Sequence, residues 1–98
     1  MNNQINCHNE VIIIGRIARP PLRCNVKNNK ALQLCIAVPN DEDYELKPNY
    51  VYVNIIADAY NLFKNKIGQP IAINGHIESN YGQRIIVDVL SFIKEKSY

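Results

Sequence analysis

At 98 residues the chain can build one domain with one hydrophobic core, which we expect to span residues 1–98 with flexible ends at 1–9 and 94–98. Hydrophobic residues make up 47 % and charged residues 20 %, which excludes a disordered chain, and no apolar run approaches the roughly 18–20 residues of a membrane-spanning helix. The net charge is only +2, and the first residues lack the basic start and long apolar stretch of a secretion signal, so we expect a cytoplasmic protein.

Two strands are predicted in the first forty residues. Val11 to Ala18 is an apolar, β-branched run, and Gly15 within it indicates a bulge or sharp bend of the kind a closing barrel needs. Arg19-Pro20-Pro21 ends or bends this strand, because proline cannot donate to a strand ladder. Cys24 to Lys30 is rich in asparagine and predicts a turn. The second strand is Ala31 to Val38, and its alternation places together Leu32, Leu34, Ile36 and Val38.

A third strand and the only helix follow a polar loop. The strand is Tyr50 to Ala57, and its alternation separates Val51, Val53 and Ile55 from Tyr50, Tyr52 and Asn54. We expect a helix of about two turns from Ala59 to Ile67, with Asp58 as its N-cap and Gly68 as its C-cap.

The last two strands form a predicted hairpin. They are Ile71 to Glu78 and Arg84 to Ile93, with a turn over residues 80–83. One face of the fourth strand is expected to carry Ile71, Ile73, Gly75 and Ile77. The resulting order, three strands, a helix and two strands, is that of the OB-fold. We therefore predict an all-β protein, a five-stranded Greek-key barrel with one short helix between strands three and four.

Several segments in this order resemble the bacterial single-stranded DNA-binding protein (SSB) family. Val11 to Ile17 is similar to the family's N-x-V-x-L-x-G-x-L, and Arg19 to Arg23 to its D-P-E-x-R. Ile67-Gly68 followed by Ile71 to Ile77 is similar to K-K-G-x-x-x-x-x-G-x-L. The resemblance runs from about Glu10 to Ile93. It implies single-stranded DNA as the ligand, bound by stacking aromatic residues and by basic residues that follow the phosphates.

The resemblance directs attention to one polar strand face and one loop tip. Tyr52 falls where the family carries a stacking aromatic residue, Tyr50 and Asn54 lie on the same face, and Tyr81 at the hairpin tip matches another family aromatic. The alternative for these tyrosines is packing across strands or against a second subunit.

Basic residues are the second part of the predicted site. Four of the nine acidic residues lie in the loop at 41–45, and the rest of the chain has 11 basic residues against 5 acidic ones, which favours a polyanionic partner. The candidates for phosphate contacts are Arg16, Arg23, Lys27, Lys30 and Arg84, with solvated surface charge as the alternative. Arg23 matches the arginine of the D-P-E-x-R segment.

Metal binding and catalysis are not indicated. The three cysteines, Cys7, Cys24 and Cys35, are widely spaced and are expected to be reduced thiols, so we predict no zinc site. His8 and His76 belong to no acid–base or nucleophile pattern. We expect no cofactor and no enzymatic activity.

The chain also departs from the family. Asp58 stands where the family has an aromatic residue, and the acidic C-terminal segment by which family members recruit other proteins is not matched. The length instead resembles tailless relatives of the primosomal replication protein N (PriB) type. We predict a homo-oligomer, dimer or tetramer, that binds single-stranded DNA without strong sequence preference, with replication or restart proteins as further partners. A primosome adapter that acts mainly through protein contacts is the alternative, and RNA binding is a third reading.

Overall fold

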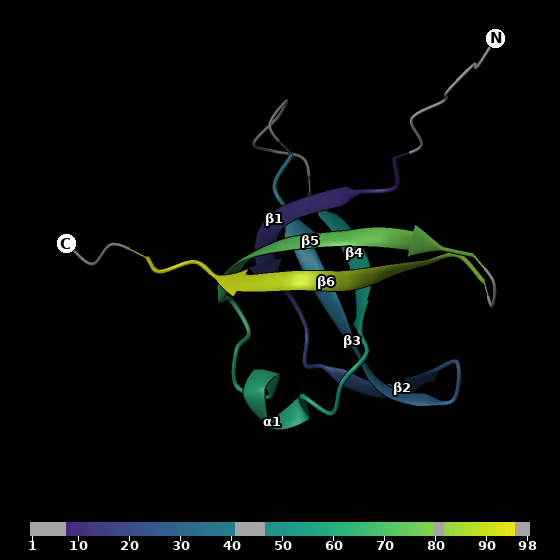
Figure 1. Cartoon of the computed structure of the whole chain (residues 1–98). Coiled ribbons are helices and arrows are strands. Elements are labelled where there is room, and N and C mark those ends of the chain that lie inside the picture. Colours follow the sequence, from purple (N-terminus) through teal and green to yellow (C-terminus); the bar gives the residue numbers. More distant parts are fainter. Residues whose placement is uncertain (1–7, 41–46, 80–81, 96–98) are drawn as a thin grey trace, which may run out of the picture.

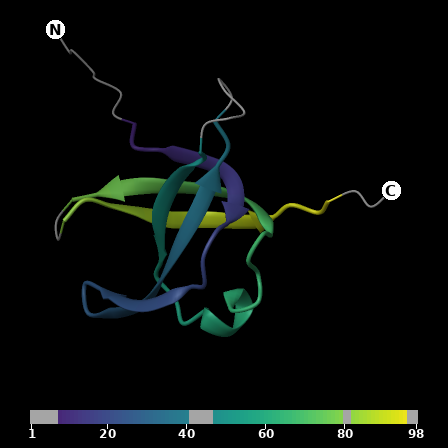
Figure 2. The same ribbon diagram turned by 180° about the vertical axis from the view of Figure 1, so that it is seen from behind.

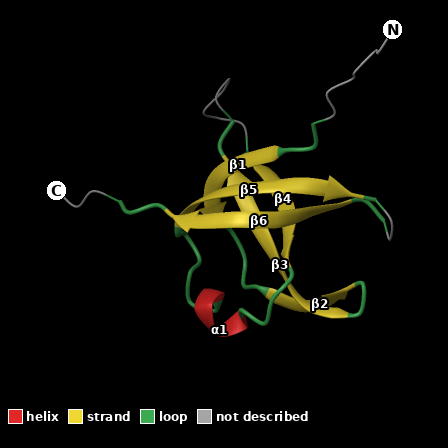
Figure 3. Cartoon of the chain, in the orientation of Figure 1, coloured by secondary structure: helices red, strands yellow, loops and turns green. Residues whose placement is uncertain are grey.

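The computed structural model describes residues 8–40, 47–79 and 82–95. Its first strands are β1 (Val11–Ile17), β2 (Leu22–Val26) and β3 (Asn29–Val38). They are followed by β4 (Asn49–Ile55), the helix α1 (Tyr60–Phe63), β5 (Pro70–Glu78) and β6 (Arg84–Phe92). The strands curl into one barrel, with α1 and the β2–β3 hairpin at one end (Figures 1 and 3).

The barrel closes because β1 pairs on both of its sides. It runs antiparallel to β5 from Val11 to Arg16, and its last residues pair with β3 through Ile17↔Ile36. The circle continues through β3–β4 and β5–β6, and the parallel pair Asn54↔Ile86 joins β4 to β6. With β1 and β2 taken as one interrupted strand, this is the predicted five-stranded OB-fold barrel with a helix between its third and fourth strands. The fold prediction is confirmed.

Gly15 is the point at which β1 leaves β5 and meets β3. A Cβ atom at this position would collide with the carbonyl oxygen of Ala37 and with the side chain of Ile36. Only glycine allows two backbones to approach so closely, which confirms the bend expected at this position.

The segment expected to be a turn is mostly strand. β2 pairs with β3 from Leu22↔Gln33 to Val26↔Asn29, so that only Lys27 and Asn28 form the turn. Both have positive φ, 51° and 64°, which is the conformation of a two-residue hairpin turn whose twist matches its strands. The prediction of a turn over Cys24 to Lys30 was too wide, because a row of asparagines does not show where pairing stops.

Alternation correctly predicted the inner faces of the long strands. Leu34, Ile36, Val53, Ile71 and Ile73 are all essentially buried and form the centre of the core. The prediction fails for Ile77, which is 39 % exposed. The β5–β6 pairing shifts register at Asn74/Gly75, and beyond this bulge the hairpin extends past the body of the barrel (Figure 1).

The helix is shorter than expected. α1 ends at Phe63, and its N-cap is Ala59, with no side-chain cap hydrogen bond, so the N-cap role of Asp58 is wrong. Gly68 does adopt positive φ, 88°, but four residues after the C-cap Lys64. Its N–H donates to the carbonyl of Ile17 at 2.7 Å. The chain therefore leaves the helix early in order to pair with the end of β1.

Three predictions concern residues outside the described part of the chain. They are the acidic loop at 41–46, Tyr81 at the hairpin tip, and the outermost residues of the two ends. Within the described ranges, no helix has the length and apolar character that crossing a bilayer requires.

Candidate nucleic-acid interface

A long open groove lies on the outer face of β4. Its larger part, about 590 Å³, lies between β4 and the β5–β6 hairpin. A smaller part, about 320 Å³, continues toward the β1–β2 connection, and Gln33 and Tyr52 line both parts. We call the two parts together the β4 groove. The residues that line it and that matter below are Arg19, Leu22, Gln33, Cys35, Tyr50, Tyr52, Asn54, Ile77 and Arg84.

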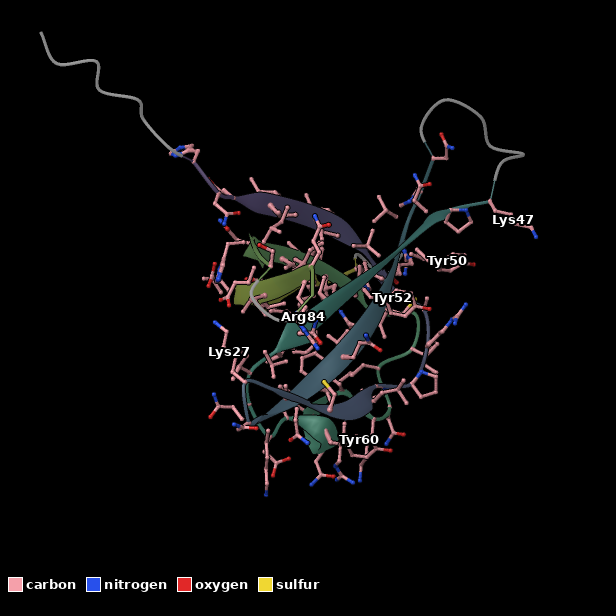
Figure 4. The ribbon with its side chains drawn as sticks, turned by 90° about the vertical axis from the view of Figure 1, so that its right-hand side faces the viewer. Lys27, Lys47, Tyr50, Tyr52, Tyr60 and Arg84 are labelled. Atoms are coloured by element: carbon pink, nitrogen blue, oxygen red, sulfur yellow. The ribbon has the colours of Figure 1, made fainter. Side chains whose placement is uncertain are left out.

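Two tyrosines project from β4 into this groove (Figure 4). Tyr50 is 49 % exposed and Tyr52 is 45 % exposed, whereas Val53 beside them is fully buried. Residues i and i+2 of a strand point the same way and lie about 6.6–6.8 Å apart. The two rings therefore form a short row along the strand, each with surface open to a flat ligand.

Arg19 is a groove residue for which the sequence predicted only the end of a strand. Its guanidinium Nη1 donates to the Tyr52 hydroxyl at 3.0 Å, and its Cζ lies 5.6 Å from the centroid of the Tyr50 ring. In the D-P-E-x-R comparison Arg19 falls at the acidic position, so the resemblance pointed to Arg23 instead. Its place beside β4 follows from strand pairing and has no local sequence signal.

Asn54 forms part of the floor of the groove. It is 4 % exposed, and its Oδ1 accepts a hydrogen bond from the Cys24 thiol at 3.7 Å. A neighbouring strand therefore covers a position that alternation placed on the open face with Tyr50 and Tyr52. Arg84 lines the hairpin end of the same groove (Figure 4).

The structure does not bring the other predicted basic residues into the groove. Arg16 donates to the carbonyl of Gly68 at 2.8 Å and pairs with Glu95 at 2.5 Å. Lys27, at the β2–β3 turn, forms an ion pair with Glu78. Their partners are carboxylates and backbone, at sites away from the two tyrosines.

Arg23 and Lys30 lie at a separate hollow of about 460 Å³ beside β2, which Asp58 also lines. The Arg23 guanidinium sits 4.1 Å from the centroid of the Tyr60 ring on α1. Figure 4 shows Tyr60 at the helix end of the barrel, apart from Tyr50 and Tyr52. Tyr81 cannot be placed, since it lies outside the described residues.

A charged cluster lies on the side of the hairpin that carries His76 and Glu78. His76 Nδ1 is 2.8 Å from Asp88 Oδ2, and its Nε2 is 2.9 Å from Glu78 Oε2. The hydrogen bond to Asp88, followed by that to Glu78, raises the pKa of His76. The hydrogen bond from Lys27, followed by that from His76, lowers the pKa of Glu78. The cluster thus links β5, β6 and the β2–β3 turn.

The groove itself has a cationic lining. Arg19 and Arg84 contribute positive charge, and no acidic residue is among the described residues that line it. Exposed Lys47 precedes β4 (Figure 4). Aromatic rings beside arginines can stack on flat π-systems and hold anionic oxygen atoms at the same time. This chemistry fits a nucleic acid strand whose bases are unpaired.

Sequence comparison finds no match for this chain among models of protein families or among curated proteins. Solved structures do match. The N-terminal domain of PriB from Thermoanaerobacter tencongensis, described as dimeric, is similar with a TM-score of 0.70 and 16 % identity over 89 % of this chain and 98 % of that chain. The mitochondrial single-stranded DNA-binding protein Rim1 from S. cerevisiae gives 0.69 and 15 %, over 89 % and 97 %.

A third similar structure is a deletion mutant of the single-stranded DNA-binding protein from Thermus aquaticus. The TM-score is 0.72 and the identity is 17 %, over 100 % of this chain and 47 % of that chain. At these identities the likeness establishes a shared fold: the chain has the OB-fold barrel that these three proteins also have.

Proposed function

We propose that the protein binds single-stranded DNA without strong sequence preference, in DNA replication, repair or recombination, and that it acts as a binding protein and not as an enzyme. The observation that carries this proposal is the row of two half-exposed tyrosines in a groove lined by arginines. Unpaired bases expose π-faces, and stacking on an aromatic ring contributes roughly 1–3 kcal/mol per base whatever the base is. Cationic side chains along the groove add a sequence-independent attraction to the phosphates.

The structural relatives support the same reading. Two of those described above are named single-stranded DNA-binding proteins, and the third is a PriB domain. In the proposal, Tyr50 and Tyr52 stack on bases, Asn54 shapes the floor, and Arg84 contacts phosphate. Phosphate contacts by Arg16, Arg23, Lys27 and Lys30 would hold parts of the DNA strand that lie beyond the groove, and these contacts remain predictions. Stacking by Tyr81 and a cytoplasmic location are predictions as well.

We include self-association in the proposal because three exposed aliphatic side chains lie close together on one face of the barrel. Ile12, Ile14 and Val89 are 67 %, 59 % and 61 % exposed. The pairs Ile12↔Asn74 and Asn74↔Val89 place two of them in one row across β1, β5 and β6, and Ile14 follows two residues after Ile12 on the same face. Such a patch suits a second copy of the chain, in a dimer or tetramer.

The first test is a titration of fluorescently labelled oligo-dT, followed by anisotropy at several salt concentrations. We expect log Kd to change linearly with log salt, by about 0.7 for each phosphate that the protein neutralises. Weak binding without salt dependence would reject the proposal in favour of the adapter that acts through protein contacts. Tighter binding of oligo-U than of oligo-dT would replace DNA by RNA as the ligand.

Tyr52→Ala tests the site. Loss of one stacking ring should weaken oligo-dT binding by roughly 1–3 kcal/mol. Leu62→Ala is the control, because Leu62 is 54 % exposed on α1 and does not line the groove. Both variants should keep the far-ultraviolet circular dichroism of the wild type. Unchanged affinity in Tyr52→Ala would move the site away from β4.

A further inference from the structure

Arg19 contacts both exposed tyrosines of the β4 groove. One Nη1–H donates to the Tyr52 hydroxyl at 3.0 Å, while the guanidinium carbon lies 5.6 Å from the Tyr50 ring centroid. The first contact fixes the direction of one ring through its hydroxyl. The second is within the range of a cation–π interaction and restricts the other ring. A single side chain therefore couples the orientations of two rings that stand two residues apart.

The backbone around Arg19 explains how the side chain reaches β4. The N–H of Ala18 donates to the carbonyl of Cys35 on β3 at 2.8 Å, and Cys35 is paired with Tyr52 in the β3–β4 ladder. Arg19 therefore follows directly after a residue that is hydrogen-bonded to β3. Together with Cys35 and Tyr52 it lines the smaller part of the groove.

The same segment is also stiff. Pro20 and Pro21 follow Arg19, and each proline ring fixes its own φ near −65°. A residue that precedes proline is itself confined to extended conformations. Pro21 is buried, which anchors the end of the segment. Arg19 is therefore held between a hydrogen bond on one side and two restricted residues on the other.

We infer that Arg19 is a positioning residue of the β4 groove, which holds Tyr50 and Tyr52 in a stacking arrangement and also contacts the phosphate next to the base on Tyr52. The inference rests on the proposed function of this groove. A guanidinium has five N–H donors in one plane, so the bond to Tyr52 leaves donors for a phosphate oxygen. Lysine carries the same charge but has no planar fork, and it cannot restrain both rings in this way.

Two substitutions separate positioning from charge. Arg19→Lys keeps the charge, and we expect oligo-dT affinity to fall roughly three- to tenfold with the salt dependence unchanged. Arg19→Met removes the charge as well, and the salt slope should decrease by about 0.7, one phosphate's share on a single strand. Lys64→Met is the control, because Lys64 follows α1, does not line the groove and carries the same charge.

A double-mutant cycle and a ligand-free measurement complete the test. Tyr52→Phe removes the hydroxyl that accepts from Arg19, so the losses in Tyr52→Phe and Arg19→Lys should not add in the double variant. In the NMR spectrum of the free protein, Arg19→Lys should shift the ring signals of both Tyr50 and Tyr52, whereas Lys64→Met should not.

Each result has one reading. If the wild type does not bind oligo-dT, the proposed function fails, and the NMR comparison still decides whether Arg19 positions the rings. If the wild type binds but Arg19→Lys equals it in affinity and in ring signals, Arg19 is at most a phosphate contact and the inference is overturned. Additive losses in the cycle would overturn it as well.

Discussion

Tyr50, Tyr52 and Asn54 follow one another on a single strand face but differ in what covers them. Two of them are about half exposed, and Asn54 is buried beneath Cys24 of β2. At Asn54, Cys24 of β2 contacts the side chain and Ile86 of β6 pairs with the backbone. A side chain's position on the outer face of a strand is therefore not enough to make it a ligand contact. Exposure also depends on which neighbouring segment passes over it.

Gly15 offers a stability prediction at the same scale. Gly15→Ala would place a methyl group against the Ala37 carbonyl and the Ile36 side chain. Neither group can move without disturbing the β1–β3 pairing that closes the barrel. We expect the free energy of unfolding in urea to decrease by about 1–3 kcal/mol, as overpacking does elsewhere. Ser91→Ala, at an exposed position on β6, is the control and should stay within about 0.5 kcal/mol of the wild type. A similarly small change in Gly15→Ala would show that β1 and β3 can move apart enough to accommodate the methyl group.

At the scale of elements, the β5–β6 hairpin forms one wall of the groove and is tied to the β2–β3 turn by charge. Ile77 and Arg84 line the groove, and His76 and Glu78 of the same hairpin join Asp88 and Lys27. The hairpin extends beyond the barrel body (Figure 1), and Ile77 in this part is 39 % exposed. The charged cluster is thus a second support for the groove wall beside backbone pairing.

This support should depend on pH. The pKa of His76 is raised by its hydrogen bonds to Asp88 and Glu78, so protonated His76 stabilises the folded state. The stabilisation is complete below the unfolded pKa of about 6.5 and is lost as the pH rises through the higher pKa of the folded protein. We expect the difference in unfolding free energy between wild type and His76→Gln to be greatest near about pH 6 and to decrease above about pH 7.

Glu78 acts at the opposite end of the pH range. Its pKa is lowered, by Lys27 first, so its contribution is present above the unfolded value of about 4.5 and is lost as the pH falls through the lower folded value. Urea denaturation of the wild type and His76→Gln from about pH 5 to 8.5 covers the pH range in which His76 titrates and stays above the range in which Glu78 titrates. Parallel pH profiles for wild type and His76→Gln would show that the cluster does not support the fold.

On the scale of the whole molecule, the two groove tyrosines and the apolar patch stand on different strands: Tyr50 and Tyr52 are on β4, and the exposed apolar residues are on β1 and β6. The face formed by β1, β5 and β6 looks toward the viewer in Figure 1, and β3 and β4 come to the front in Figure 2. Two copies that met through the apolar patch would leave Tyr50 and Tyr52 of β4 outside the contact. Self-association and ligand binding are then compatible in one particle.

A charge placed in the apolar patch should separate the copies. Ile14→Glu puts a carboxylate at a position that is 59 % exposed in the single chain, so the fold should tolerate it while the interface does not. Sedimentation should show a dimer or tetramer for the wild type and a smaller species for Ile14→Glu, a monomer if the wild type is a dimer. Leu62→Glu, at an exposed apolar residue on α1, should sediment like the wild type. A monomeric wild type, or an unchanged assembly in Ile14→Glu, would contradict this interface.

Much of the barrel was predictable from the sequence because alternation is a local property. The strand period of two residues is visible in Leu32 to Val38 and in Tyr50 to Ile55, and it correctly identified the core side chains and the two outward tyrosines. The order of the elements then indicated an OB-fold. Alternation placed Tyr50 and Tyr52 on the correct face of their strand, and the structure shows that both are exposed while Asn54 is buried.

Which arginine lies beside the groove tyrosines could be learned only from the tertiary structure. Arg19, which the sequence did not single out, reaches Tyr50 and Tyr52 because barrel closure sets the β1–β2 connection beside β3. Arg16 and Lys27, which were predicted phosphate contacts, pair with Glu95 and Glu78 instead. A side chain's face on its own strand follows from the residues next to it. Its neighbours across the barrel follow from pairings between residues far apart in the chain, and only the folded molecule decides those.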